Sequence, residues 1–190
     1  MAKKEVTQPG TCYLCGEKFT QADLIKHIRK THIMAGDGEA CLLLKVEGAD
    51  NPDYWLLLDM PANCKLSVLD AFLRRIWLEC CGHISAFRTR HEYVISMNRQ
   101  IGTFNANSKI QHDYAPIMTT TLSITVLGVS TRPKQRDKVR LLARNDSFVY
   151  TCNDCGQLAS LTAETFDPDY RRIYMCEDCV SAMDPKSYNR

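Results

Sequence analysis

The sequence lacks any long apolar run. None of its 190 residues belong to a stretch approaching the ~20 consecutive apolar residues that span a bilayer, which argues against a membrane protein. No apolar segment follows Lys3 and Lys4, so we expect no secretory signal peptide and a cytoplasmic location. The formal net charge is only +2, unlike that of a strongly cationic nucleic-acid coat protein. Apolar residues make up 45% and charged residues 24%, which favours a globular chain over a disordered or fibrous one.

Catalytic motifs are also missing from the sequence. There is no Gly-rich phosphate loop, no nucleophile elbow and no His-Glu-x-x-His helix, and no small-molecule substrate is evident. Cys80, Cys81 and His83 could form a third metal site or a nucleophile pair, but cysteines packing as small hydrophobes at a helix end fit better. One alternative is an enzyme acting on nucleic acid, as a nuclease or recombinase. Its candidate residues would be His83, His91, His112 and Asp113.

Cysteine, in contrast, is abundant. The chain has ten cysteines, and six of them form three Cys-x-x-Cys pairs that lie toward its two ends. Because no export signal is expected, metal–thiolate sites are favoured over disulfides. This placement predicts two metal-stapled ends around a middle that folds by burial of apolar side chains.

Residues 1–33 have the pattern of a two-cysteine, two-histidine zinc finger. Cys12 and Cys15 are followed by His27 and His32, and the spacer between the pairs, residues 16–26, is slightly shorter than usual. Two thiolates from a turn and two imidazoles from one helix can complete a tetrahedral zinc site. The two histidines are five residues apart, which is more than one helical turn. The helix must therefore tighten or loosen near its end for both to bind one ion. Zinc would supply the folding energy of so small a segment.

A finger of this kind packs a small core and presents one helix face to its target. Phe19 and Leu24 stand at the core positions, and residues 1–33 are basic, with six Lys/Arg against three Asp/Glu. Because one finger reads only ~3 base pairs, nucleic-acid contact and a protein-contact or purely structural role both stay open. The candidate contact residues are Thr20, Asp23, Lys26, Arg29 and Lys30.

The C-terminal end of the chain contains a second zinc pattern. Two Cys-x-x-Cys pairs flank a spacer, residues 156–175, whose length is at the upper limit for a four-cysteine zinc site, and the ligands would be Cys152, Cys155, Cys176 and Cys179. Four thiolates leave no open position for water, so we expect a structural ion. Gly156 stands where a metal-binding turn needs a positive φ. Residues 151–190 hold seven Asp/Glu against four Lys/Arg, which favours a protein partner over a phosphate.

Between the metal sites we expect an α+β domain over residues 41–150, preceded by a linker at 33–40. The predicted strands are 41–47, 54–60, 84–87, 92–97, 119–129 and 139–143. One amphipathic helix follows Ser67, its candidate N-cap, with Asp70 in a capping box and Gly82 as its end. These elements predict a central mixed or antiparallel sheet with one main helix.

A basic segment, residues 131–138, separates the last two predicted strands. Its only acid is Asp137, and its cations are Arg132, Lys134, Arg136 and Lys138. A solvated hairpin loop is one interpretation, because exposed charges cluster in turns. A contact with phosphate groups is the other.

The stretch from Trp77 to Phe87, WLECCGHISAF, together with residues 69–76, resembles the plasmid pRiA4b ORF-3-like family. Members of that family are often labelled transposon passenger proteins, so the resemblance implies a mobile-element context and an α+β fold. The resemblance also covers residues 112–114, 119–126 and 141–145, the N-terminal Cys-x-x-Cys-Gly and the C-terminal zinc ribbon. The chain departs from the family at residues 114–118, where an Asp-Phe-Gly turn is expected.

These patterns predict three parts: a ββα zinc finger at 1–33, the α+β domain at 41–150 and a zinc ribbon at 151–183, with two structural zinc ions. We expect a non-enzymatic adaptor. Its finger and basic segment would contact nucleic acid or a nucleoprotein, and its acidic ribbon and core would contact protein. A structural subunit of a larger complex is a further alternative beside the enzyme.

Overall fold

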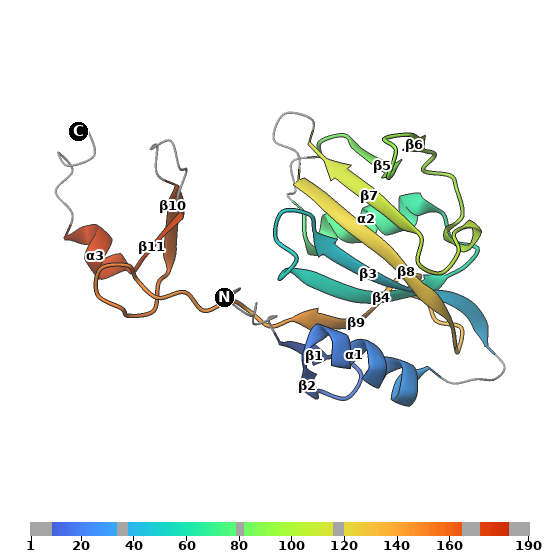
Figure 1. Cartoon of the computed structure of the whole chain (residues 1–190), viewed down its shortest axis with the longest axis horizontal. Coiled ribbons are helices and arrows are strands. Elements are labelled where there is room, and N and C mark those ends of the chain that lie inside the picture. Colours follow the sequence, from blue (N-terminus) through green and yellow to red (C-terminus); the bar gives the residue numbers. More distant parts are fainter. Residues whose placement is uncertain (1–8, 34–37, 79–81, 116–119, 165–171, 183–190) are drawn as a thin grey trace, which may run out of the picture. The chain divides into compact units, whose positions relative to one another are not determined.

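A computed structural model shows an α+β protein made of two compact units, Met1–Asp146 and Ser147–Arg190. The described residues are 9–33, 38–78, 82–115, 120–164 and 172–182. Across these ranges every strand pair is antiparallel, and helices are few (Figure 1). The predicted fold class is thus confirmed. No helix in the described ranges is long and apolar enough to cross a membrane.

The first unit is built on a nine-stranded sheet with the order β2-β1-β9-β4-β3-β8-β7-β5-β6. Its strands are β1 (Gly10–Cys12), β2 (Lys18–Phe19), β3 (Glu39–Gly48), β4 (Trp55–Pro61), β5 (Ser85–Thr89), β6 (Val94–Ile95), β7 (Lys109–Tyr114), β8 (Thr120–Arg132) and β9 (Arg140–Asn145). Its helices are α1 (Gln21–His27), the π-helical η1 (Ile28–His32), α2 (Leu66–Ile76) and the 3-10 turn η2 (Ile101–Thr103). The second unit contains β10 (Leu161–Glu164), β11 (Arg172–Met175) and α3 (Glu177–Ser181).

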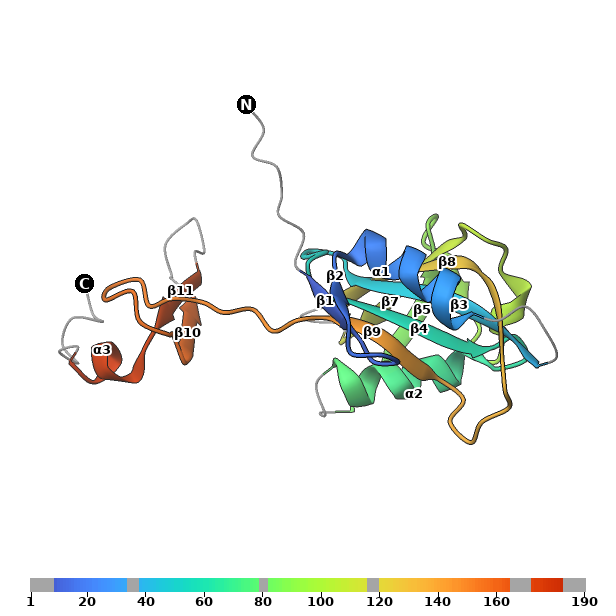
Figure 2. The ribbon, with the colours of Figure 1, turned by 90° about the horizontal axis from the view of Figure 1, so that it is seen from below.

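Both faces of the centre of the large sheet are covered, by α2 on one side and by α1 with η1 on the other (Figure 2). Leu42, Leu44 and their neighbours on one face pack against Leu69 of α2. Leu43, on the opposite face, packs with Leu24 of α1. Strand β4 is buried at every position, because a strand between two apolar layers has no solvent-facing side.

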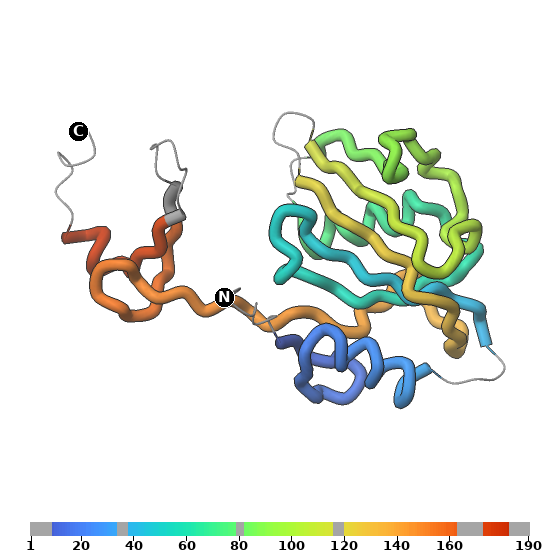
Figure 3. Tube along the Cα trace, in the orientation of Figure 1, coloured from blue at the N-terminus to red at the C-terminus, as the bar shows by residue number. Residues whose placement is uncertain are grey.

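The finger belongs to the same sheet as the central domain. Strand β1 lies beside β9 (Figure 3), and Thr11 pairs with Arg144 and Cys12 with Ala143. Trp55 of β4 is 1% exposed and packs in one cluster with Cys12, Leu24 and Ile28. The segment 1–33 therefore shares one compact unit with residues 41–146 of the predicted central domain, and residues 147–150 fall in the second unit.

Helix α2 occurs where its apolar periodicity predicts it, but its ends differ from the prediction. The N-cap is Lys65 and not Ser67, and it has no side-chain cap. The amides of Leu66 and Ser67 are instead satisfied by the carbonyls of Arg99 and Met97, so a capping hydroxyl is not needed. The helix ends at Ile76, well before Gly82. The proposed capping box is wrong as well, because Asp70 bonds to Ser85, Arg74 and His112.

The predicted strands are present, with two differences. Strand β7 is absent from the prediction, although its burial alternates at every residue from Lys109 to Tyr114. Strand β8 is longer than predicted and ends at Arg132, so the basic segment begins inside the sheet. Part of the predicted linker, residues 34–37, lies outside the described residues, and Glu39 already belongs to β3.

Candidate metal centres

The four predicted finger ligands converge. The ligand atoms of Cys12, Cys15, His27 and His32 all lie within 4.8 Å of one another. The sulfur of Cys15 is 3.2 Å from Nε2 of His27, which is 3.1 Å from Nε2 of His32. A tetrahedral ion with ligands at ~2.0–2.3 Å has edges of ~3.3–3.8 Å, so small shifts would admit one ion.

A π-helical turn brings the two histidines together. Positions i and i+5 differ by about 140° around an α-helix, which would separate His27 from His32. The chain instead becomes π-helical from Ile28 to His32, and the N–H of Ile33 donates to the carbonyl of Ile28 at 3.0 Å. Such a turn closes through an i→i+5 bond and therefore places both rings on one side. This is the loosening that the histidine spacing requires.

The surroundings of His32 favour its neutral form, which is the form that binds a metal. Burial lowers the pKa of His32, and the nearby His27 and Arg140 lower it further. Glu17 places a carboxylate oxygen 3.7 Å from Nδ1 of His27, the nitrogen that faces away from the ligand group. A carboxylate there can hold the ring in the orientation that leaves Nε2 free to bind a metal.

The second metal group is formed by the four C-terminal cysteines. The sulfurs of Cys152, Cys155, Cys176 and Cys179 lie within 4.8 Å of one another, with 3.5 Å between those of Cys155 and Cys176. The first pair sits in a turn in which Gly156 has φ +74°, as predicted. The second pair opens α3, where the sulfur of Cys176 caps the helix and accepts from the N–H of Cys179 at 3.5 Å.

Thiol chemistry in the second group suits a cation. Backbone N–H groups of Cys155 and then Cys176 lower the pKa of Cys152 to about 6. Hydrogen bonds with the neighbouring sulfurs of Cys155, Cys176 and Cys152 raise the pKa of Cys179, because they hold its proton among the sulfurs. A bound metal ion can take the place of that proton, so the donor set fits a metal that prefers four sulfurs.

The residues predicted to contact nucleic acid from the finger are exposed, but most are already engaged. Thr20 is the N-cap of α1, and its oxygen accepts from the N–H of Asp23 at 3.3 Å. Lys26 pairs with Asp23 at 2.9 Å. Arg29 donates to the carbonyl of Leu127, which ties η1 to β8. Helix capping and the docking of η1 on β8 therefore explain why these polar residues occur at these positions.

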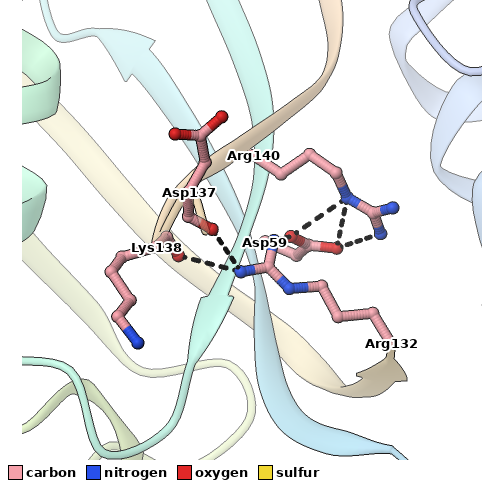
Figure 4. Close-up of polar contacts among 5 residues, drawn as sticks. All are labelled: Asp59, Arg132, Asp137, Lys138 and Arg140. Carbon is pink, nitrogen blue, oxygen red and sulfur yellow. Dashed lines mark hydrogen bonds and ion pairs between the residues drawn. The ribbon is translucent and has the colours of Figure 1, made fainter. Parts of the chain in front are cut away.

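Arg132 is not a surface residue, so its prediction as a nucleic-acid contact is wrong. Its side chain is 1% exposed and pairs with Asp59, which is 2% exposed. Arg140 also binds Asp59, and Nη2 of Arg132 donates to the backbone carbonyls of Asp137 and Lys138 at 2.9 and 3.1 Å (Figure 4). A buried guanidinium must be paired with an acid and hydrogen-bonded, and the acid here, Asp59, lies far from Arg132 in the sequence. The remaining cations of the segment are exposed: Lys134, Arg136 and Lys138.

The candidate enzyme residues do not converge. His112 is fully buried, while Asp113, its neighbour on β7, points to the other face and pairs with Arg88 at 2.9 Å. His83 and His91 are both exposed. The two Cys/His groups above are the only potential metal groups found among the described residues. Cys80 and Cys81, proposed beside His83, lie outside the described residues, as do residues 116–118 of the segment that departs from the family.

The sequence patterns do not predict the partly buried polar cluster around Asp70. Its carboxylate accepts from the hydroxyl of Ser85 at 2.6 Å, from Nε of Arg74 at 3.0 Å and from Nε2 of His112 at 2.7 Å. Burial raises the pKa of Asp70, but the bonds from Ser85, His112 and Arg74 outweigh it and leave this pKa below its usual range. Burial lowers the pKa of His112. Ser85 contacts the acid and not the imidazole, so this arrangement ties α2 to β5 and β7 and activates no nucleophile.

Comparison with known proteins informs the fold alone. No family model matches the chain, and no curated protein matches it. One similar crystal structure is that of a protein of unknown function, MM3350 from Methanosarcina mazei Go1. It has 12% sequence identity and a TM-score of 0.50, over 64% of this chain and 76% of that chain. Membership of the pRiA4b ORF-3-like family therefore stays a prediction.

Proposed function

We propose that the protein is a non-enzymatic adaptor in which two structural zinc ions organise the finger and the ribbon. The observation that carries this proposal is that each group has four protein ligands within 4.8 Å. A zinc ion with four protein ligands has no open position for a reacting water, whereas catalytic zinc sites keep one.

Elemental analysis of the reduced, metal-loaded protein tests this proposal. We expect two equivalents of zinc in the wild type and one equivalent in either Cys15→Ser or Cys155→Ser. Fewer than two equivalents in carefully reduced wild-type protein would refute the two-site proposal. A metal other than zinc, bound in the same stoichiometry, would refute the assignment of zinc alone.

The proposed partners follow from the charges. Lys26 and Lys30 on the finger helix and the exposed cations of the basic segment would contact the phosphates of nucleic acid or of a nucleoprotein. Because α1 and the basic segment lie toward opposite faces of the sheet (Figure 2), these are two separate contact regions. The proposed context is a mobile element, which rests on the family resemblance.

A salt titration tests the nucleic-acid contact. Fluorescence anisotropy can measure the binding of a labelled duplex and of a labelled single strand. For each, the logarithm of the binding constant should fall linearly with the logarithm of the salt concentration. No salt-dependent binding at low ionic strength would remove nucleic acid from the proposed partners.

A structural subunit of a larger complex is the second candidate, and the ribbon favours it. Three apolar side chains of the second unit are exposed, Val149 at 74%, Leu158 at 68% and Leu161 at 44%, on a segment whose sequence is acidic. Such side chains suit a protein contact. Partners that co-purify from the host after nuclease treatment, and are lost in a Leu158→Glu variant, would support this candidate.

A further inference from the structure

A cleft of about 350 Å³ lies between α2 and the end of the basic segment. Ser67 and Arg75 line it from α2, and Arg136 and Lys138 line it from the segment. Val68 and Phe72 provide apolar surface beside these polar groups. Ser67 and Arg75 stand at positions i and i+8 of the helix, which corresponds to about 12 Å along the axis. The cleft therefore suits an elongated ligand of modest width.

Three cations line this cleft from two elements. Among the described residues, none of Arg75, Arg136 and Lys138 forms an ion pair, and the only acidic residue in the lining is Asp137. Arg75 lies over the ring of Phe72, with 5.6 Å between its guanidinium carbon and the ring centroid. Cations gathered from two elements create a local positive potential that the net charge of +2 does not reveal.

The basic segment is held in place from inside the protein. Nη2 of Arg132 donates to the carbonyls of Asp137 and Lys138, while Asp59 anchors the same guanidinium (Figure 4). The backbone that carries Arg136 and Lys138 is therefore tied to a buried ion pair. A ligand would find these cations in position and would lose less free energy in ordering a loop.

The start of α2 adds little to ligand binding through its backbone. The N–H groups of Leu66 and Ser67 already donate to the carbonyls of Arg99 and Met97, and that of Val68 donates to Lys65. Side chains must therefore supply the donors. Two guanidiniums, one ammonium and the Ser67 hydroxyl offer more donors than the two oxygens of a carboxylate need, and they match the three free oxygens of a phosphate monoester or the backbone phosphates of a strand.

We infer that this cleft binds phosphate groups, with Arg75, Arg136, Lys138 and Ser67 as the contacts. The inference rests on the proposed function, because it locates the phosphate contact of the basic segment and adds two residues of α2 to it. The phosphate could belong to a nucleic-acid strand or to a free mononucleotide. Both sources share the same recognition chemistry.

Binding of a labelled oligothymidylate, measured by anisotropy across a salt series, tests the cleft. Arg75→Gln and Arg136→Gln should each weaken binding about 3–10-fold at low salt and lower the salt slope by ~0.7. Lys109→Gln is the matched control, because it removes one exposed charge from β7, outside both the cleft and the proposed contact residues. It should change affinity less than about twofold. Denaturation curves of each variant check that the fold is intact.

A second arm uses NMR to follow the cleft amides with inorganic phosphate, thymidine 5′-monophosphate and a hexaglutamate peptide. Shifts with the mononucleotide, without tighter oligonucleotide binding, would identify a free phosphate monoester and support the cleft while refuting the nucleic-acid contact. If the oligonucleotide binds but Arg75→Gln behaves like Lys109→Gln, the cleft inference is wrong and the proposed function survives. Shifts with hexaglutamate alone would overturn the phosphate assignment in favour of an acidic peptide.

Discussion

The two metal centres begin with nearly the same local structure. In each, the glycine after the Cys-x-x-Cys pair has a positive φ, +81° at Gly16 and +74° at Gly156. The amide of each glycine donates to the carbonyl of the first cysteine, Cys12 at 2.8 Å and Cys152 at 3.0 Å. The two turns therefore present their sulfurs in the same way.

The surroundings of the two turns differ. Cys12 is fully buried in a cluster with Trp55 and Leu57 of the large sheet, and its strand pairs with β9. The second centre has a small cluster of its own, in which two of the three buried residues, Cys152 and Cys176, are candidate ligands. The same ligand turn thus serves as one part of a large core in the finger and as most of the core in the ribbon. Loss of the metal should have different consequences in the two places.

Removing one exposed ligand from each centre should give the largest effect. Cys15→Ser should lower the unfolding free energy of the first unit by ~4 kcal/mol or more, because the finger helix covers one face of the sheet. Cys155→Ser should leave the first unit within ~0.5 kcal/mol of the wild type. Both tryptophans, Trp55 and Trp77, belong to the first unit, so their fluorescence during denaturation reports on it alone. Equal effects of the two variants would show that the units are energetically coupled.

Truncation of the finger's docking side chain should have the next largest effect. Leu24 is fully buried between α1 and the sheet, and Leu24→Ala should destabilise the first unit by ~2–5 kcal/mol. Val180→Ala is the matched change in the ribbon, where the side chain is only half-buried, and it should not alter tryptophan-detected unfolding. A finger that folds independently of the sheet would lose metal affinity in Leu24→Ala without any change in that unfolding curve.

Mild acid should distinguish the interiors of the two units. Burial holds the pKa of His112 below its ordinary value of ~6.5, so the folded protein favours the neutral imidazole. The corresponding stability is present above pH ~6.5 and is lost as the pH falls toward the lower folded pKa. A His112→Gln variant keeps a donor toward Asp70 and should lose less stability than the wild type between pH 6.5 and about 5.

The metal ligands that protonate in the same range are common to both proteins, so they cancel in that difference. Parallel pH profiles for the wild type and His112→Gln would contradict this account. The second unit, Ser147–Arg190, contains none of the five histidines, so its response to acid should come from its thiolates and carboxylates.

Helix capping should give the smallest effect. Thr20 caps α1 as an ordinary hydroxyl, whereas the cap of α3 is the sulfur of Cys176, itself a candidate ligand. Thr20→Ala should cost ~1 kcal/mol in tryptophan-detected unfolding, and Thr20→Ser should restore most of it. Nucleic-acid affinity should stay unchanged in Thr20→Ala. A loss of affinity without a loss of stability would instead assign Thr20 to base contact.

Features of the candidate sites that depend on short spacings could be predicted from the sequence. The eight ligands, the positive φ of Gly156 and the need for an irregular turn between His27 and His32 all follow from neighbours close together in the chain. The amphipathic helix and most strands follow from periodicity. The start of α2 could not be predicted in this way, because the amides of Leu66 and Ser67 donate to the carbonyls of Arg99 and Met97, which lie far along the chain.

The docking of the finger could have been suspected from one signal. The segments 42–44 and 55–58 are continuous apolar runs, and a strand with no polar alternation is buried on both faces. Only one amphipathic helix was predicted for the central domain, so a second covering layer was missing. Leu24 and Ile28 of the finger supply that layer.

The sequence by itself determined which atoms can bind metal, because a ligand turn and a short helix are local structures whose geometry needs no distant partner. Only the tertiary structure decided which charges reach solvent. Arg132 and Lys134 look alike in the basic segment, yet Asp59, far away in the chain, draws one of them into the core and leaves the other exposed. The desolvation of a guanidinium is tolerated only where such a carboxylate faces it, and the packing of the sheet alone brings the two together.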